Sequence, residues 1–132
     1  MDACEQPNTF APLYPLDASI REKIETVATR IFGAGDVDYA PVAQRKIDEF
    51  TRHGLGGLPV CMAKTHLSLT HDPQLRNAPE GYTLPIRDIR AYTGAGWLVP
   101  LCGDILQMPG LGKAPAAFDI DIDADGRTIG LF

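Results

Sequence analysis

Residues 58–65 read Leu58-Pro-Val-Cys-Met-Ala-Lys-Thr65, and this apolar run is the stretch around which the fold is organised. Apolar side chains follow one another without a polar alternation, glycines precede the run, and Lys64 and Thr65 end it. Continuous apolar strands occur where both faces of a sheet are covered. Pro59 is compatible with such a strand because it stands at the start. The run therefore predicts a strand buried on both faces, with Cys61 packed in the core.

The segment before this run predicts a helix over residues 19–32. Ser19 and Glu22 have the spacing of a capping box, in which each residue bonds the other's backbone N–H. Apolar residues recur at helical intervals behind them, and Gly33 supplies a stop. The charged residues of this helix, Lys23 among them, are expected to face water.

A short strand and a second helix are predicted between the first helix and the apolar run. Val37-Asp-Tyr39 has strand character, Pro41 is favoured at a first helical position, and Gly54 ends the helix. Helices and strands thus alternate up to the run. This order predicts the α/β class, with a mixed sheet and flanking helices.

The second half of the chain predicts a long loop followed by strands. Residues 65–79 lack periodicity, residues 83–92 alternate in part, and a glycine turn links them to the apolar stretch 97–101. Residues 105–108 are expected to form another short strand. The end of the chain, 118–132, alternates aspartate with apolar residues around Asp125-Gly126, which predicts a C-terminal β-hairpin.

Composition excludes several classes of function. A chain of 132 residues has the length of one domain, and a net charge of −5 disfavours nucleic acid and anionic membranes as partners. No apolar run reaches the roughly 20 residues of a membrane span, and residues 1–7 do not read as a signal peptide. Cys4, Cys61 and Cys102 lack C-x-x-C spacing and are expected to be reduced thiols. These features predict a cytoplasmic protein.

Candidate ligand contacts follow directly from the apolar run. Lys64 ends the predicted strand, where a compact cation suits a phosphate or carboxylate, although lysines at strand ends also turn to water. His66 and His71 lie in the loop beyond it. Open α/β sheets place ligands at the carboxyl ends of their strands, so both a ligand role and a surface role stay open for these histidines.

A nucleotide rim is the second candidate site, formed by Pro79, Gly81 and Tyr82. A proline ring and an exposed glycine backbone offer a flat apolar edge for an adenine ring, and a tyrosine adds stacking area. A turn before a strand would use the same residue types. The sequence contains no phosphate-binding loop of the G-x-x-x-x-G-K-[ST] type and no histidine or cysteine metal motif.

Asp121-x-Asp123-x-Asp125-Gly126 matches the first half of an EF-hand calcium loop. The twelfth position, which a glutamate occupies in that loop, is Phe132. The preceding residues alternate as a strand, where the motif requires a helix. We therefore assign no metal ligands from the sequence.

Several blocks in a fixed order resemble the C-terminal part of formate–tetrahydrofolate ligase. Their order and spacing agree with the family along almost the whole chain. The blocks are the run 58–65, Tyr82-Thr-Leu-Pro-Ile-Arg-Asp-Ile-Arg90, Gly94-Ala-Gly96, Pro100-Leu101, Met108-Pro-Gly-Leu111 and the closing stretch 115–132.

The resemblance implies an ATP-dependent ligase that joins formate to tetrahydrofolate through formyl phosphate, giving 10-formyltetrahydrofolate. ATP with Mg²⁺ is the cofactor of the full-length family enzyme, and a monovalent cation is associated with it. The turn at Pro79 and Gly81 would lie beside the adenine.

The resemblance also makes residues 1–132 a C-terminal domain or fragment of a larger multi-domain ligase. The family's phosphate-binding and folate-stacking machinery would lie in an N-terminal region that this chain does not contain. No catalytic residue is therefore expected here, and the chain is expected to be inactive alone. Its expected partners are the N-terminal ligase region or further copies of itself.

The alternative is a non-catalytic subunit, or a remnant, that binds a separately encoded N-terminal ligase chain. An exposed apolar patch would be its structural signature.

Overall fold

The computed structural model describes residues 11–105, 115 and 118–130. The helix, strand and helix that the sequence predicts before the apolar run follow in that order, whereas the run itself forms no strand. The elements are α1 (Ile20–Arg30), β1 (Asp36–Tyr39), α2 (Pro41–Arg52), the 3₁₀ turn η2 (Leu55–Gly57), β2 (Thr83–Ile86), β3 (Asp88–Tyr92), β4 (Trp97–Leu101), β5 (Asp121–Ile122) and β6 (Thr128–Ile129). β1 and β2 pair in parallel, whereas β3 with β4 and β5 with β6 pair antiparallel, which confirms the α/β class with mixed strand pairing.

The first helix begins at the predicted capping box. The Glu22 N–H donates to Ser19 Oγ at 3.2 Å, and the Ser19 N–H donates to Glu22 Oε2 at 2.8 Å. At the other end Gly33 has φ +74°, and the Ala34 N–H donates to the Ala28 carbonyl at 3.0 Å. The left-handed conformation of Gly33 brings the Ala34 N–H to a carbonyl that the end of the helix would otherwise leave unpaired.

One prediction about this helix is wrong, because Lys23 is fully buried. Its Nζ donates to the carbonyl of Gly56 at 2.6 Å and to the carbonyl of Leu58 at 3.1 Å. Burial lowers the pKa of the Lys23 ammonium. The side chain thereby fixes the entry to the apolar run against α1, through partners that lie far away in the sequence.

The apolar run lies beside β4 but does not form the predicted strand. Backbone bonds join the two segments at 2.7–3.0 Å, from Leu98 to Pro59, from Cys61 to Leu98, from Ala63 to Pro100 and from Cys102 to Ala63. Only the isolated parallel bridges Val60↔Leu98 and Ala63↔Leu101 result. Pro100 lacks the N–H that would donate to Cys61 in this ladder, so the pairing is interrupted at its centre.

Val60 is the one fully buried residue of the run, so the prediction of a strand buried on both faces is also wrong. Val60 is buried with 6% exposure, whereas the next residue, Cys61, is exposed. The expected core position of Cys61 is therefore contradicted. One face of the segment packs on the core, and the other face has no cover in the described part of the chain.

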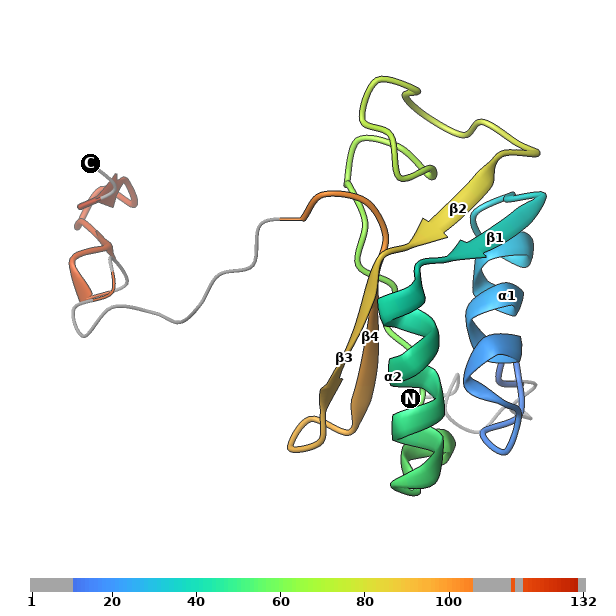
Figure 1. The fold of residues 1–132 in the computed structure, drawn as a ribbon. Coiled ribbons are helices and arrows are strands. Elements are labelled where there is room, and N and C mark those ends of the chain that lie inside the picture. The colour runs from blue at the N-terminus through green and yellow to red at the C-terminus, as the bar shows by residue number, and fades with distance from the viewer. Residues whose placement is uncertain (1–10, 106–114, 116–117, 131–132) are drawn as a thin grey trace.

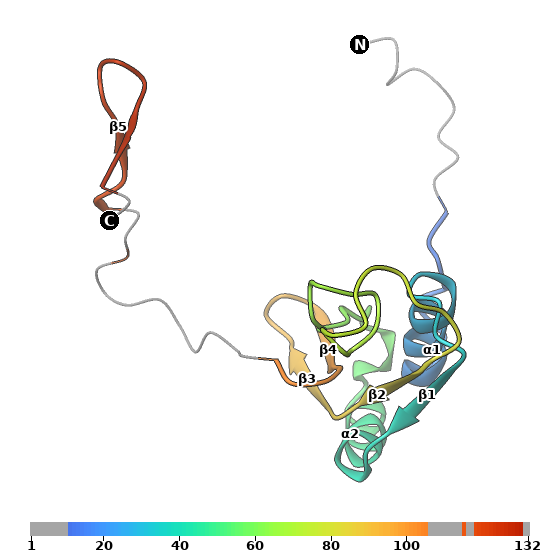
Figure 2. The ribbon, with the colours of Figure 1, turned by 90° about the horizontal axis from the view of Figure 1, so that it is seen from above.

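Residues 83–92 form two strands with different partners. β2 pairs with β1, and β3 pairs with β4 after the chain passes Arg87, whose N–H donates to the Leu101 carbonyl at 2.9 Å. The predicted glycine turn joins β3 to β4. Figures 1 and 2 show α1 and α2 together on one side of the β3–β4 hairpin.

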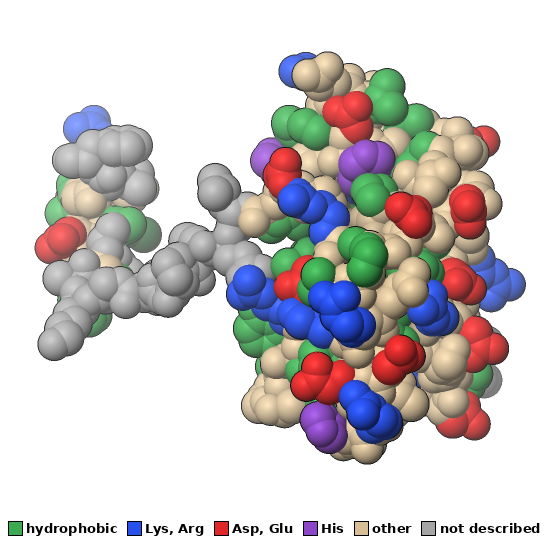
Figure 3. All heavy atoms as spheres, in the orientation of Figure 1, with side chains coloured by type: hydrophobic (Ala, Val, Ile, Leu, Met, Phe, Trp, Pro, Cys, Tyr) green, Lys and Arg blue, Asp and Glu red, His purple; other side chains and the backbone are tan. Residues whose placement is uncertain are grey.

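The core lies between these helices and the strands. Its buried apolar members are Ile20, Ile24, Ala28, Ala34, Tyr39, Ala43, Ile47, Val60, Leu84, Ile86, Ile89, Leu98 and Cys102. Side chains of both charge signs intermingle over the surface that Figure 3 shows.

The C-terminal hairpin is present, as β5 and β6 around Asp125-Gly126, and the Gly126 N–H donates to the Asp123 carbonyl at 3.0 Å. Its apolar residues are exposed, Phe118 by 77% and Ile122 by 68%. The short strand expected at residues 105–108 lies outside the described residues except for Ile105, which is in no strand.

We predict that Lys23→Met destabilises the chain by about 1–3 kcal/mol, because methionine keeps the buried stem and leaves two carbonyls without a donor. Urea unfolding followed by circular dichroism measures the change. Arg30→Ala, at an exposed position of the same helix, is the control and should change stability by less than about 0.5 kcal/mol. Equal stability of the two variants would contradict a bracing role for Lys23.

Candidate functional site

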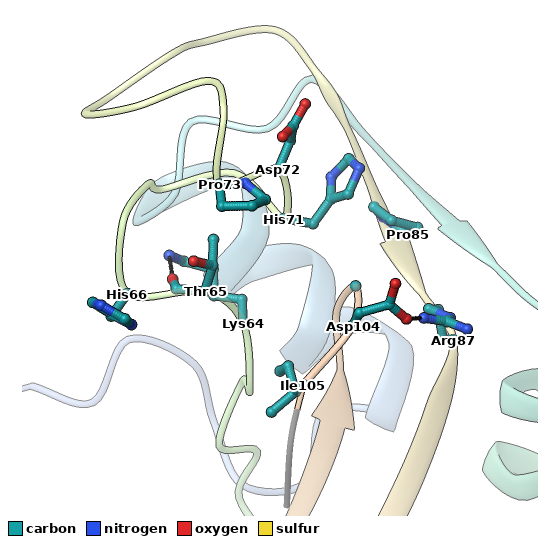
Figure 4. Close-up of a pocket in the computed structure, with 11 residues that line it drawn as sticks. Lys64, Thr65, His66, His71, Asp72, Pro73, Pro85, Arg87, Asp104 and Ile105 are labelled. Carbon is teal, nitrogen blue, oxygen red and sulfur yellow. Dashed lines mark hydrogen bonds and ion pairs between the residues drawn. The ribbon is translucent and has the colours of Figure 1, made fainter.

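A cavity of about 710 Å³ opens where the apolar run and β4, which are parallel, both end (Figure 4). The loop after the run, the β2–β3 junction and the segment after β4 line it. Its lining residues are Lys64, Thr65, His66, His71, Asp72, Pro73, Pro85, Arg87, Gly103, Asp104 and Ile105. The cavity thus contains both ligand contacts predicted from the run, Lys64 and His66.

The Lys64 ammonium is already engaged by the protein. Its Nζ donates to the carbonyl of Thr65 at 3.0 Å and to the carbonyl of Ser68, and it lies 5.0 Å from the centroid of the Phe32 ring. Burial lowers the pKa of Lys64, and the nearby Cys102 sulfur acts in the opposite direction. These two hydrogen bonds hold the first residues of the long loop, 65–68, against the Lys64 side chain.

The two loop histidines differ in their surroundings. His66 is exposed, and Figure 4 shows its ring directed away from the other labelled side chains. His71 is half-buried, and its Nδ1 is buried without a hydrogen-bond partner in the described structure. The backbone of Gly103 packs tightly against this loop, since a Cβ on Gly103 would lie 3.1 Å from the His71 carbonyl oxygen. His71 is therefore the more enclosed of the two candidates.

An ion pair between Arg87 and Asp104 closes one wall of the cavity. It joins the β2–β3 junction to the segment after β4. Both side chains are largely exposed, at 55% and 95%, so the pair adds little stability. Sequence reasoning missed Asp104, because its partner Arg87 lies in another segment, between β2 and β3, and no local pattern links the two residues.

The predicted nucleotide rim lies on the turn before β2. The Gly81 N–H donates to the Gly33 carbonyl at 2.9 Å, and the Gly35 N–H donates to the Tyr82 carbonyl at 2.9 Å. A Cβ on Gly35 would lie 3.1 Å from the Gly81 carbonyl oxygen, so this close approach favours glycine. Two backbone bonds therefore fix the rim against the end of α1.

Tyr82 anchors the rim from the core side. Its ring is half-buried against the core, and its hydroxyl lies 3.0 Å from the Phe32 carbonyl and 2.7 Å from the Leu69 carbonyl. One hydroxyl proton serves one of these carbonyls at a time. Burial raises the pKa of Tyr82.

The two predicted sites line different hollows. Pro79 lines a smaller one of about 250 Å³, with the end of α1, Leu69 and Glu80, whereas Lys64 and His66 line the large cavity. Gly81 is exposed and lines neither of the two. The structure therefore keeps the rim apart from the cavity at the strand ends.

Comparison with known proteins identifies the family. The sequence model described as formate–tetrahydrofolate ligase matches residues 1–132. The chain belongs to the formate–tetrahydrofolate ligase family. This result confirms the resemblance seen in the sequence blocks.

Individual family members are similar over nearly the whole chain. The formate–tetrahydrofolate ligase of Roseiflexus castenholzii is 61% identical over 131 residues, that of Desulforamulus reducens 55% over 130 and that of Saccharopolyspora erythraea 53% over 131. These alignments cover 98–99% of this chain but only 23% of each relative. The chain thus spans about a quarter of the length of the ligases it matches.

The ligands of the Mg²⁺ that the family resemblance implies are not identified by the described residues. They contain no group of three or more histidine, cysteine or carboxylate side chains able to hold a metal ion. We therefore assign no ligand for Mg²⁺ or for a monovalent cation. Among the described helices, none is both long and apolar enough to cross a membrane.

We predict that Tyr82→Phe lowers stability by about 1 kcal/mol, because the ring stays while the hydroxyl's hydrogen bonds are lost. Thermal unfolding measures the loss. Tyr92→Phe is the matched control, since Tyr92 is 46% exposed and should tolerate the change. A Tyr82→Phe variant as stable as Tyr92→Phe would show that the hydroxyl does not anchor the rim.

Proposed function

We propose that this chain forms one part of an ATP-dependent ligase that joins formate to tetrahydrofolate in the cytoplasm. The observation that carries the proposal is the 61% identity over 131 residues to the ligase of Roseiflexus castenholzii, together with the family match along residues 1–132. In this reaction a formate oxygen attacks the γ-phosphorus of ATP, which gives formyl phosphate and ADP. The N10 nitrogen of tetrahydrofolate then attacks the formyl carbon, and phosphate leaves with formation of 10-formyltetrahydrofolate.

The chain is proposed to be inactive by itself. Phosphoryl transfer needs groups that cradle the triphosphate and hold magnesium. The sequence has no phosphate-binding loop, and the described residues gather no metal-binding group. The remaining part of the ligase would therefore supply these functions.

The proposed contribution of this chain is one wall of the nucleotide pocket, at Pro79 and Gly81. Both lie at the surface, Pro79 half-buried and Gly81 exposed, and backbone bonds to Gly33 and Gly35 hold the turn in place. A preorganised apolar edge binds a flat base without the cost of ordering a loop. Tyr82 supports this edge from the core side through its hydroxyl.

A non-catalytic subunit that binds a separately encoded ligase chain is the second candidate. The apolar side chains exposed on the β3–β4 hairpin, Tyr92 at 46% and Trp97 at 43%, favour an association with another polypeptide. Such a subunit would change the assembly of the ligase and leave its affinity for ATP unchanged.

We predict that this chain alone forms no 10-formyltetrahydrofolate from formate, ATP and tetrahydrofolate. Mixed with the part of the Roseiflexus castenholzii ligase that does not align with it, supplied as a second polypeptide, it should restore activity. A spectrophotometric assay of the folate product measures both. The full-length Roseiflexus ligase is the positive control, and the second polypeptide alone should be inactive. Product formation by this chain alone would refute the proposal that the rest of the ligase supplies the groups for phosphoryl transfer.

We predict that Pro79→Ala raises the KM for ATP of the reconstituted ligase about fivefold, because it removes roughly 1 kcal/mol of apolar contact. The maximal rate and the KM for formate should change less than twofold. Pro73→Ala, at a proline that lines the other cavity, is the matched control. Equal ATP affinities in the two variants would favour the non-catalytic subunit.

A further inference from the structure

One face of the sheet formed by β3, β4 and residues 59–63 has no covering helix among the residues that the structure describes. On the core face, Val60, Ile89 and Leu98 are buried. Cross-strand partners share a face, so the pairs Tyr92↔Trp97, Arg90↔Val99 and Ala63↔Leu101 lie on the opposite side. We call this side the outer sheet face, and its apolar members are Cys61, Ala63, Tyr92, Trp97, Val99 and Leu101.

The outer sheet face is accessible to a partner. Tyr92 is 46% exposed, Trp97 is 43% exposed and Cys61 is exposed, whereas Val99 and Leu101 are half-buried. Both helices lie on the other side of the β3–β4 hairpin (Figures 1 and 2). No described helix therefore covers this face.

The residue pattern of β4 and the run indicates that their part of this face is built to be covered. β4 reads Trp97-Leu-Val-Pro-Leu101, and residues 59–63 beside it are equally apolar, so neither segment carries polar residues on its outward positions. The polar residues of this side, Asp88 and Arg90, lie on β3 at one edge, where Asp88 pairs with Lys46 of α2 at 2.6 Å. A hairpin with one solvated face normally alternates apolar with polar residues, and continuous apolar strands occur where both faces are covered. The described part of the chain places helices over only one face.

We propose that the outer sheet face docks against the part of the ligase that this chain does not include. The inference rests on the proposed function. The chain spans 23% of the length of its relatives, so most of a family ligase lies outside it and is available as the partner. The partner surface is an apolar polypeptide face that buries Trp97 and Tyr92, since aromatic side chains are the usual anchors of such interfaces.

The C-terminal hairpin also exposes apolar side chains, those of Phe118, Ile120, Ile122 and Ile129, but it is no part of this sheet. Elsewhere in the described chain the exposed apolar residues are more scattered. Leu16, Ile31 and Leu75 are each more than half exposed, at 56%, 52% and 52%, but they come from three separate segments. Single exposed apolar residues of this kind are ordinary on soluble domains. They serve here as controls.

Binding to the remaining Roseiflexus castenholzii ligase polypeptide tests the proposal. We expect Trp97→Asp to weaken the complex at least tenfold in isothermal titration calorimetry, and Leu75→Asp, at a similarly exposed leucine, to change the dissociation constant less than twofold. Circular dichroism of each variant checks that it is folded. Equal affinities of the two folded variants would overturn the proposal.

The thiol of Cys61 gives an independent readout that needs no change in the interface. In a Cys4→Ser chain, maleimide should label Cys61, whereas Cys102 is fully buried and its burial raises the pKa of its thiol to about 12. We expect the ligase polypeptide to slow labelling of Cys61 at least tenfold. Unchanged labelling in a complex would place the interface elsewhere and overturn the proposal.

The outcomes separate this proposal from the proposed function. Protection of Cys61 without formation of 10-formyltetrahydrofolate would support the docking face and contradict the catalytic role. Formation of 10-formyltetrahydrofolate by the mixture while Cys61 remains reactive would support the catalytic role and contradict the docking face. Protection of Cys61 in this chain alone, with sedimentation as a dimer, would show that a second copy occupies the face and would overturn the proposal.

Discussion

The backbone pairing of β4 on both of its sides is the constraint on which the rest of the structure depends. β4 pairs antiparallel with β3 and lies parallel to the apolar run, which in turn leads to Lys64 and the large cavity. Pro100 lies in the middle of β4 and has no N–H, so the backbone hydrogen bond to the Cys61 carbonyl is missing from the parallel pairing. The parallel pairing therefore relies on the flanking bonds and on Lys23, which fixes the carbonyls where the run begins.

Local signals predicted the helices and the C-terminal hairpin, because their causes lie within a few residues, but they predicted a strand at residues 58–65 that does not form. The bonds between Ser19 and Glu22 span three positions, and Pro41 and Asp125-Gly126 act on their own turns. The burial of Lys23 and the ion pair between Arg87 and Asp104 depend on partners in other elements, which no periodicity shows. For the same reason the sequence identified Lys64 and Pro79 as candidates but not their separation into two hollows.

The rim and the cavity also differ in how their geometry is maintained. Backbone bonds between glycines fix the rim at Gly81, and they do not depend on any titrating side chain. The cavity depends on the charged side chains of Lys64 and Arg87, each already occupied by a partner within the chain. A ligand in the cavity would have to compete with these contacts, whereas a base on the rim would only cover surface. This difference favours the rim as the contact that needs least reorganisation.

The wrong prediction for Cys61 has a physical cause that bears on the whole ligase. A run of apolar residues indicates that both faces of a strand are covered, but it does not indicate which polypeptide covers them. In the described part of this chain α1 and α2 cover one face, and no helix covers the outer sheet face around Cys61, Val99 and Trp97. Because the chain spans 23% of the length of its relatives, we propose that the remaining ligase covers the outer sheet face. The apolar pattern that misdescribes the isolated chain would then describe the assembled enzyme.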